Sequence, residues 1–374
     1  MISAHRLTHH IWQRQGFWGE VGWLALTPLS LGFSALVRAR NLFYDRGWLP
    51  VERPPFKVIS VGNLTVGGTG KTPMVLWLAQ ALQGRGHRVG ILTRGYGGSN
   101  KEITVVGTAG QAIATPAEVG DEPVMLARAF AGVVISGRDR VAAAGLARRR
   151  FALDVVILDD GFQHRRLDRD VDLLLVNGRG GTGNGWLLPA GPLREPPAAV
   201  RRADVVIITK GGTHGREGWS ATGQRGAVFS GDLQPTALLS SVRGRWHELP
   251  VGLLSGRRVM ALTGIADPMP FYHSLREWEA EIAEVMEFPD HHAYTPVDWR
   301  AISLAGQKFD LIVTTEKDLV KLERFPSAAG KLVALRVRME IEHADRLLDL
   351  VERQLREAVT ATSVHPSTSS GRTE

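Results

Sequence analysis

Short apolar runs alternate with longer amphipathic stretches through the middle of the chain. The runs are rich in Val, Ile and Leu, which predicts buried strands at Lys57–Val61, Val89–Thr93, Val133–Ser136, Asp154–Leu158, Val171–Val176 and Val205–Thr209. The stretches between them have helical character at Thr72–Gln83, Pro123–Phe130 and Arg138–Arg149. Strands that alternate with helices are typical of a parallel sheet wrapped by helices, so we predict an α/β fold.

A second, smaller α/β portion is expected further along the chain. The stretch Gly211–Arg225 is rich in Gly and Thr, which indicates a linker or long loop. Beyond it, strands are expected near Arg258–Leu262 and Leu311–Thr314, and helices near Pro270–Val285 and Ala344–Glu357. The polar C-terminal residues predict disorder. The expected organisation is an N-terminal segment at 1–53, a core at 54–212, a second lobe at 213–359 and a disordered tail at 360–374.

The N-terminal segment has a pattern of its own. Val21–Val37 carries no charge and is flanked by Trp12, Phe17, Trp18, Phe43, Tyr44 and Trp48. This run is at the short end of the roughly 17–25 residues needed to cross a bilayer, and Gly22, Pro28 and Gly32 interrupt it, which disfavours a clean spanning helix. A cleavable signal peptide is disfavoured because Glu20 precedes the run and no small-x-small site follows it.

Charge favours a membrane surface for this segment. Residues 1–53 hold six arginines against three acids, a local charge of +3. A basic, aromatic-rich apolar segment is typical of a helix lying in an anionic membrane surface. The alternative is an apolar helix packed on the protein's own core. We favour the membrane because the run precedes the first strand of the core.

Composition limits the available chemistry. The chain has no cysteine, which excludes disulfides, thiolate metal sites and thiol nucleophiles. The net charge of +7 and the pI near 10.0 indicate an anionic partner. Basic clusters such as Arg148–Arg150 and Arg201–Arg202 are scattered, without interleaved aromatic residues that would stack on bases. We therefore expect no nucleic-acid binding.

The strongest chemical motif is FKVISVGNLTVGGTGKTP at residues 56–73. It follows a predicted strand and opens a predicted helix, as does a phosphate-binding loop of the form G-x-x-x-x-G-K-[ST], but Thr65 stands where the first glycine belongs. Its backbone N–H groups would wrap phosphates, Lys71 would reach the β- and γ-phosphates, and Thr72 would ligate magnesium. The predicted nucleotide-binding residues are Gly67, Gly68, Thr69, Gly70, Lys71 and Thr72.

An acidic pair ends another predicted strand. In LDDGFQH, Asp159 and Asp160 follow four apolar residues. A nucleotide site needs such carboxylates to organise Mg²⁺, whereas the alternative is a solvated pair at a strand tip. Together with the glycine-rich loop, the pair favours a P-loop NTPase-like core that binds ATP and Mg²⁺.

Seven stretches together resemble one known family, the tetraacyldisaccharide 4'-kinases, which are the lipid A 4'-kinases of Gram-negative bacteria. Running in order from Ser60 to Leu322, they are SVGNLTVGGTGKTP, LTRGYGG, VGDEP, LDDGFQH, PAGPLREP, FPDHHAY and TTEKDLVKL. The apolar N-terminus fits as well, and Thr65 belongs to this family's form of the loop. The resemblance implies transfer of the ATP γ-phosphate to the 4'-hydroxyl of a tetraacylated glucosamine disaccharide 1-phosphate, giving lipid IVA.

The resemblance also implies individual roles. It identifies Asp121 and His291 as a catalytic pair, one accepting the hydroxyl proton and the other orienting it, without assigning which does which. The alternative for Asp121 is a helix N-cap, because Gly120–Pro123 is a helix-start signal. The resemblance adds Glu195 to Thr72, Asp159 and Asp160 as a magnesium ligand.

Further groups are expected around the transferring phosphate, where negative charge develops. Lys71 is the first choice, and contacts to the phosphate or the acceptor are expected from Arg94, Tyr96, Arg138, Arg140, Gln163, His164 and Arg194. Each arginine has an alternative as the partner of a nearby acid, and Tyr96 has one as a packed turn residue. TTEKD at 314–318 receives no role.

The expected partners are the acylated disaccharide phosphate and an anionic membrane surface. Because ATP is the phosphate donor, the expected location is the cytoplasmic face of the inner membrane, peripheral or N-terminally anchored. The rival from another class is a membrane-associated P-loop ATPase or GTPase switch that regulates a protein. Apart from that rival, no protein partner is inferred.

Overall fold

The computed structural model describes residue 8 and residues 10–211, 226–242, 245–325 and 330–362. The predicted linker Gly211–Arg225 lies outside these residues except for Gly211, and so does the predicted tail from residue 363. The last helix, α11, spans Ala344–Thr362, so it continues past the start of the tail predicted at residue 360.

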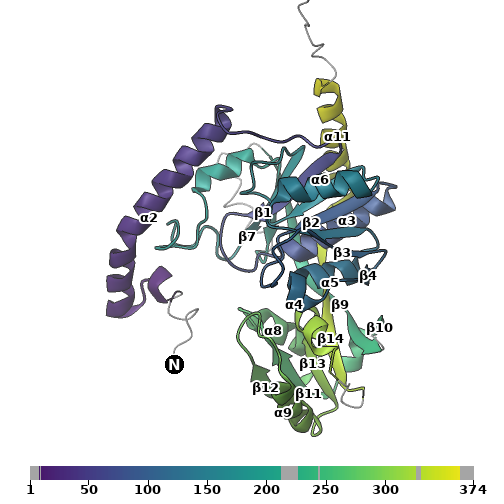
Figure 1. Ribbon diagram of the computed structural model, residues 1–374. Helices are drawn as coiled ribbons and strands as arrows, with labels where there is room; N and C mark the ends of the chain where they lie inside the picture. Colours follow the sequence, from purple (N-terminus) through teal and green to yellow (C-terminus); the bar gives the residue numbers. More distant parts are fainter. Residues whose placement is uncertain (1–7, 9, 212–225, 243–244, 326–329, 363–374) are drawn as a thin grey trace, which may run out of the picture.

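Six parallel strands form the central part of the sheet (Figure 1), in the spatial order β8, β7, β1, β6, β2, β5. In chain order, their bounds are Lys57–Asn63 (β1), Val89–Thr93 (β2), Val133–Ser136 (β5), Val155–Asp159 (β6), Val171–Asn177 (β7) and Val205–Thr209 (β8). All six predicted strands are present to within two residues, which confirms the parallel α/β prediction. At the far edge, β3 (Thr104–Thr108) and β4 (Gln111–Ala112) are antiparallel.

Helices cover both faces of this part because its strands are apolar on both sides. On one face, α3 (Lys71–Gly84), α5 (Asp121–Ala129) and α11 pack with Ile59 and Val61 of β1 in one hydrophobic cluster. On the other face, α6 (Arg140–Arg150) packs with Val58, the intervening residue of β1. Alternate residues of β1 therefore face opposite layers. The short helix α4 (Pro116–Val119) leads into α5.

The sheet continues without a break into the second α/β portion. Strand β9 (Ala227–Val242) pairs parallel with β8 and antiparallel with β14 (Leu332–Ile341), and beyond β14 the order is β13, β11, β12. The remaining elements of this portion are β10 (Arg245–Leu249), η2 (Val251–Leu254), β11 (Arg258–Thr263), α8 (Met269–Glu277), β12 (Glu281–Glu287), α9 (Pro296–Gly306), β13 (Leu311–Thr315) and α10 (Glu316–Leu322). The 3₁₀ turn η1, in the first portion, spans Pro197–Arg202.

One predicted helix is wrong over half its length. The helix expected at Pro270–Val285 ends at Glu277, Glu279 has a left-handed φ of 57°, and Glu281–Glu287 forms the edge strand β12. Burial alternates along this strand, but Glu284 is half-buried and Val285 is exposed, so its apolar residues do not show the period-two pattern that predicts a strand.

The N-terminal helix α2 (Gly16–Asp45) is continuous over 30 residues, about 45 Å. The prediction that Gly22, Pro28 and Gly32 interrupt it is wrong, because all three lie inside one helix. Within the described residues it is the one helix long and apolar enough to cross a membrane, by length and composition. Figure 1 shows it standing apart from the sheet.

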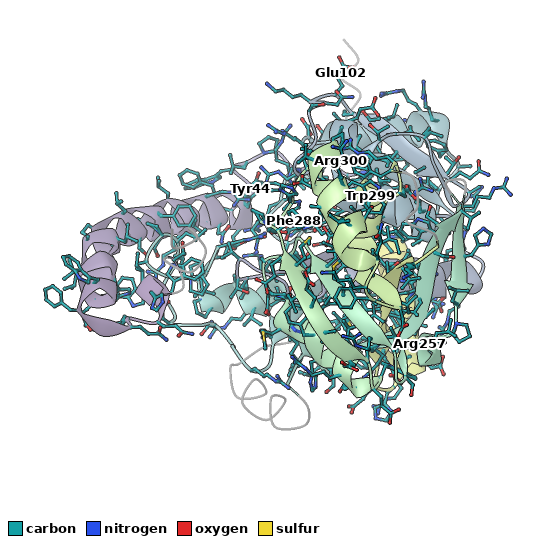
Figure 2. The ribbon with its side chains drawn as sticks, turned by 90° about the horizontal axis from the view of Figure 1, so that it is seen from below. Tyr44, Glu102, Arg257, Phe288, Trp299 and Arg300 are labelled. Atoms are coloured by element: carbon teal, nitrogen blue, oxygen red, sulfur yellow. The ribbon has the colours of Figure 1, made fainter. Side chains whose placement is uncertain are left out.

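Most of α2 faces away from the protein. Most of its large apolar residues are exposed, up to 81% for Trp18, whereas Trp23, Leu26 and Phe33 are half-buried and only Gly19, Ser30 and Val37 are buried. The alternative of an apolar helix packed into the protein's own core therefore does not describe α2. Its C-terminal half holds it to the body: Asn41 Nδ2 donates to Glu195 Oε2 at 2.7 Å. In Figure 2, Tyr44 lies at the end of α2 nearest the body.

Candidate active site

The glycine-rich loop joins β1 to α3, as the sequence predicts. Gly67 and Gly70 have φ values of 110° and 83°, a region that glycine adopts without steric cost. Thr65 instead lies in an extended segment that forms a β-bridge with Leu193. A first glycine is therefore unnecessary at Thr65, since the chain turns two residues later.

Asn63, at the end of β1, organises this loop. Its Nδ2 donates to Thr69 Oγ1 at 3.0 Å, and its Oδ1 accepts from Lys71 Nζ at 3.2 Å. Lys71 Nζ also lies 3.6 Å from Asp160 Oδ1. The amide thus fixes both the loop and its lysine at the N-terminus of α3, where backbone N–H groups and the helix dipole favour phosphate.

The two aspartates after β6 differ in their surroundings. Asp159 is buried and accepts one hydrogen bond, 3.2 Å, from Thr93 Oγ1. Burial, together with the nearby carboxylates of Glu122 and Asp160, raises the pKa of Asp159 to about 7. Burial also opposes ionisation of Asp160, but Lys71 and Arg194 outweigh it and lower the pKa of that carboxyl.

This arrangement suits a magnesium ion at the nucleotide. The raised pKa of Asp159 shows that too little positive charge surrounds this buried carboxylate. A bound divalent cation would supply that charge. Among the described residues, no group of three or more His, Asp or Glu side chains is arranged to hold a metal by itself. Mg²⁺ in kinase sites commonly takes one or two carboxylates and completes its shell with phosphate oxygens and water, so Thr72, Asp159 and Asp160 fit that pattern.

Glu195 has other partners. It is fully buried, and its two oxygens accept from Arg202 at 2.8 and 3.1 Å and from Asn41 at 2.7 Å. The predicted magnesium role of Glu195 therefore competes with an ion pair that already satisfies both oxygens. In the structure, the Glu195 carboxylate links α2 to the core through its contacts with Asn41 and Arg202.

Asp121 and His291 meet although 170 positions separate them in the sequence. His291 Nδ1 lies 3.2 Å from Asp121 Oδ1. Asp121 stands in the first turn of α5, and His291, with a φ of 58°, lies in the loop after β12. Gly120 occupies the N-cap position, so the alternative of Asp121 as the N-cap is wrong. The contact joins the two portions of the molecule.

The surroundings of Asp121 favour its carboxylate form. Burial opposes ionisation of Asp121, but the hydrogen bond with His291 and the charges of Lys317 and Lys321 lower the pKa of Asp121 to about 2. The same hydrogen bond raises the pKa of His291. Glu122, the residue after Asp121, acts on Asp159, so the element that carries Asp121 also reaches the nucleotide site.

The other predicted contact residues lie at the acidic strand end, beside the Asp121–His291 pair, or exposed without an assigned contact. Those at the acidic strand end include Arg194, whose Nη1 donates to both oxygens of Asp160 at 2.9 and 2.7 Å, and Gln163, whose Nε2 donates to the Asn63 carbonyl oxygen. Beside them, Arg140 is buried and donates to the Asp159 carbonyl oxygen at 3.0 Å; burial lowers its pKa to about 10, so it stays cationic.

Near the pair, the exposed Tyr96 has its ring 5.2 Å from the ring of His291. Burial, aided by the charge of Arg140, lowers the pKa of His164 to about 4, and its Nε2 is a buried atom without a hydrogen-bond partner in the described part of the chain. Arg94 and Arg138 are exposed. For these two, the structure gives no contact that assigns a role.

Sequence reasoning missed Asn63, Lys317 and Lys321. A signal for Asn63 was present, because it is a polar residue at the carboxyl end of the central strand, where α/β proteins bind ligands. Lys317 and Lys321 lie in TTEKDLVKL, whose TTEKD segment carries no role predictable from its sequence. Their proximity to Asp121 and His291 depends on how α10 packs on α5, which no local pattern encodes.

A phosphate-binding loop beside an acidic strand end, with an Asp–His pair close by, defines a P-loop phosphotransferase. The family model described as "Tetraacyldisaccharide-1-P 4'-kinase" matches residues 22–356. The chain therefore belongs to the tetraacyldisaccharide-1-P 4'-kinase family.

Individual relatives agree with this assignment. The chain is 44% identical over 337 residues to the tetraacyldisaccharide 4'-kinase of Syntrophus aciditrophicus, covering 85% of this chain and 89% of the relative. It is 41% identical to that of Anaeromyxobacter dehalogenans strain 2CP-C, covering 88% and 90%. A crystal structure of LpxK from Aquifex aeolicus in complex with ATP is 33% identical, with a TM-score of 0.75 and coverage of 89% of this chain and 99% of that one.

Proposed function

We propose that this protein is an ATP-dependent kinase that phosphorylates the 4'-hydroxyl of a tetraacyldisaccharide 1-phosphate, giving lipid IVA in lipid A biosynthesis. The observation that carries the proposal is the contact between Asp121 and His291, 3.2 Å, next to Glu122, whose charge acts on Asp159 at the acidic strand end. A hydroxyl acceptor needs such a proton acceptor, whereas a nucleotide switch does not. Family membership also favours the kinase over the switch.

The nucleotide would lie along the loop and the N-terminus of α3. Backbone N–H groups of residues 67–72 would hold the phosphate oxygens, and Lys71 would leave Asp160 to reach the β- and γ-phosphates. Thr72, Asp159 and Asp160 would hold Mg²⁺, which neutralises charge on the phosphates. The cationic Arg140 stands beside Asp159 and adds fixed positive charge.

The acceptor hydroxyl would approach Asp121 and His291. Proton transfer to this pair as the new O–P bond forms would keep the oxygen nucleophilic without a strong base in solution. Because the low pKa of Asp121 keeps it ionised at neutral pH, the pair is ready to accept a proton. Tyr96, exposed beside His291, would contact the sugar.

The membrane side of the proposal rests on α2. Burying each CH₂ of an acyl chain is worth about 0.8 kcal/mol, so a four-chain acceptor stays in the bilayer and the enzyme must reach it there. The exposed apolar residues of α2 suit insertion, and its C-terminal half is tied to the core through Asn41. ATP places the reaction on the cytoplasmic face of the inner membrane.

The test is acceptor-dependent ATP consumption. Purified full-length protein in detergent is given Mg-ATP with and without tetraacyl disaccharide 1-phosphate. The proposal expects consumption to rise strongly only with the acceptor. Consumption that responds to membranes or protein partners and ignores the disaccharide would favour the switch and contradict the kinase.

A further inference from the structure

The short helix α10 supplies two ammonium groups to the Asp121–His291 pair. Lys317 Nζ lies 3.1 Å from His291 Nε2, and Lys321 Nζ lies 3.4 Å from Asp121 Oδ2. The two lysines are four residues apart, so they share one face of the helix. Thr315 begins α10 by accepting from the Asp318 N–H at 3.1 Å, which fixes where that face points.

The contact with Lys317 limits where the imidazole proton can be. An ammonium group has three donors and no acceptor, so a hydrogen bond from Lys317 requires a bare lone pair on Nε2. A neutral ring then carries its proton on Nδ1, which faces Asp121 Oδ1. The hydrogen bond made by one ring nitrogen sets the state of the other.

We propose that Lys317 is a positioning residue, which holds His291 as the neutral Nδ1–H tautomer pointing at Asp121 and opposes its conversion to imidazolium. This inference rests on the proposed function, in which the pair takes the proton of the acceptor hydroxyl. It also gives TTEKD a role: the motif carries the lysine that sets the state of a histidine on another loop.

The lysine is fixed in place from two sides. Its Nζ lies 3.0 Å from Asp290 Oδ1 and 3.9 Å from Glu122 Oε1, and its side chain is only 16% exposed. Burial opposes its charge, but Asp121, Glu122 and Asp290 outweigh burial and raise the pKa of Lys317. Lys317 therefore stays an ammonium donor throughout the range in which histidine titrates.

Three charged groups face the ring of His291. His291 is faced by Asp121 from α5, by Lys317 from α10, and by Asp290 from its own loop at 3.8 Å. The ring of Tyr96 packs on it from the loop after β2. The two acids favour the imidazolium form, whereas burial and the charge of Lys317 oppose it; Lys317 is the charged group among these opposing influences.

The competing interpretation is a purely structural lysine that pairs with Asp290 and Glu122. Such a lysine would stabilise the fold without determining the state of His291. The two interpretations differ in the tautomer of the ring and in the pH dependence of turnover, so both are measured.

The first measurement is the imidazole ¹⁵N spectrum of full-length protein labelled at histidine. His291→Gln identifies the resonances of His291 among the twelve histidines. The inference expects a protonated Nδ1 and a bare Nε2 above neutral pH, and loss of that pattern in Lys317→Met. A protonated Nε2 in the wild type would overturn it, whether or not the protein proves to be a kinase.

The second measurement is the pH profile of kcat/KM. Removing the positive charge of Lys317 raises the pKa of His291, so His291 becomes protonated at a higher pH. Protonated His291 lowers the rate whether Asp121 or His291 is the base. The acidic limb should therefore move up by about one pH unit in Lys317→Met, and Lys317→Arg should restore most of the shift. The exposed Lys308→Met serves as the matched control and should keep the wild-type limb.

The outcomes separate the inference from the proposed function. If the wild-type protein transfers no phosphate to the disaccharide, the proposed function fails, and the ¹⁵N spectrum alone then decides whether Lys317 sets the tautomer of His291. If Asp121→Asn is inactive but Lys317→Met keeps the wild-type limb and tautomer, the kinase stands and the positioning role is overturned. If Lys317→Met does not fold, Lys317→Gln is measured instead. The same upward shift of the acidic limb is expected there, and an unshifted limb would overturn the positioning role.

Discussion

At the scale of single residues, the site depends on how neighbours set the state of a few side chains. Asp121 is ionised because His291 and two lysines outweigh its burial, and Asp159 resists ionisation because burial dominates. Two carboxylates in neighbouring sites are thus driven in opposite directions. That contrast suits a division of labour, with Asp121 acting on a proton and Asp159 acting on a cation.

Removing either member of the pair should slow the chemical step. Asp121→Asn and His291→Gln are each expected to lower kcat by about 10²–10⁴, with little change in ATP affinity, because neither residue lies in the phosphate-binding loop. Steady-state kinetics with both substrates checks this. The neighbouring His292→Gln is the matched control, since His292 pairs with Asp298 and not with Asp121. Near-normal kcat in both variants would remove the pair from the mechanism.

Gly62 of β1 tests the packing behind the loop. A Cβ at this position would lie 2.5 Å from Phe162 Cβ and 2.8 Å from Phe162 N, so the chain after β6 would have to move. Gly62→Ala is expected to destabilise the protein by about 1–3 kcal/mol, measured by denaturant unfolding. Gly84→Ala, with nothing near its Cβ, is the control and should be neutral or stabilising. Equal stability of both variants would contradict the close approach.

At the scale of elements, local pattern predicted the parallel core well and the second portion less well. Strands such as β2 and β5 are short, continuous apolar runs between turn residues, and all six were found. Strand β9 was missed because Gly231 and Pro235 interrupt its apolar run, β14 because charged residues interrupt its own, and β12 because its apolar residues do not alternate. The phosphate-binding residues were predictable for the same reason, because they lie in one continuous local motif. The contact of Lys317 with His291 was not, because it depends on the packing of α10 on α5.

Helix α2 has an apolar surface that is mostly exposed, apart from contacts such as Trp23 with Trp186 and Val37 with the core. Trp18 and Leu29 are 81% and 63% exposed. The double variant Trp18→Glu/Leu29→Glu should weaken co-sedimentation with anionic vesicles about tenfold or more while leaving Tm unchanged, because it removes apolar area only from the membrane side. Val297→Glu/Leu304→Glu, equally exposed on α9, is the control and should bind as the wild type does. Unchanged binding of the α2 variant would contradict the membrane role.

At the scale of the whole molecule, one sheet carries a nucleotide loop at its centre and brings His291 to it from the other end of the chain. Because β9 and β14 continue the sheet, Asp121 and His291 are held by elements that share one framework. The hydrogen-bonded ladder between β8 and β9 crosses the predicted boundary at residue 212, so one sheet runs through both portions. The division into a core and a second lobe stays a prediction about independent units.

Nucleotide binding should stabilise this framework. At Mg-ATP about 100-fold above its Kd, the free energy of unfolding should rise by about 2.7 kcal/mol, since ligand binds only the folded state. Thermal unfolding with and without Mg-ATP measures the effect. Lys71→Met should lose most of it, and the exposed Lys308→Met should retain it. An equal Tm increase in both variants would place the nucleotide elsewhere.

The most direct measurement of the central claim is the fate of the γ-phosphate. Full-length protein is incubated in detergent with Mg-ATP labelled at the γ-position and tetraacyl disaccharide 1-phosphate, and the lipid is analysed by mass spectrometry and by its label. We expect one labelled phosphate on the 4'-oxygen of the sugar with the wild-type protein, and almost none with Asp121→Asn. Label found only in inorganic phosphate, with the lipid unchanged, would contradict the account.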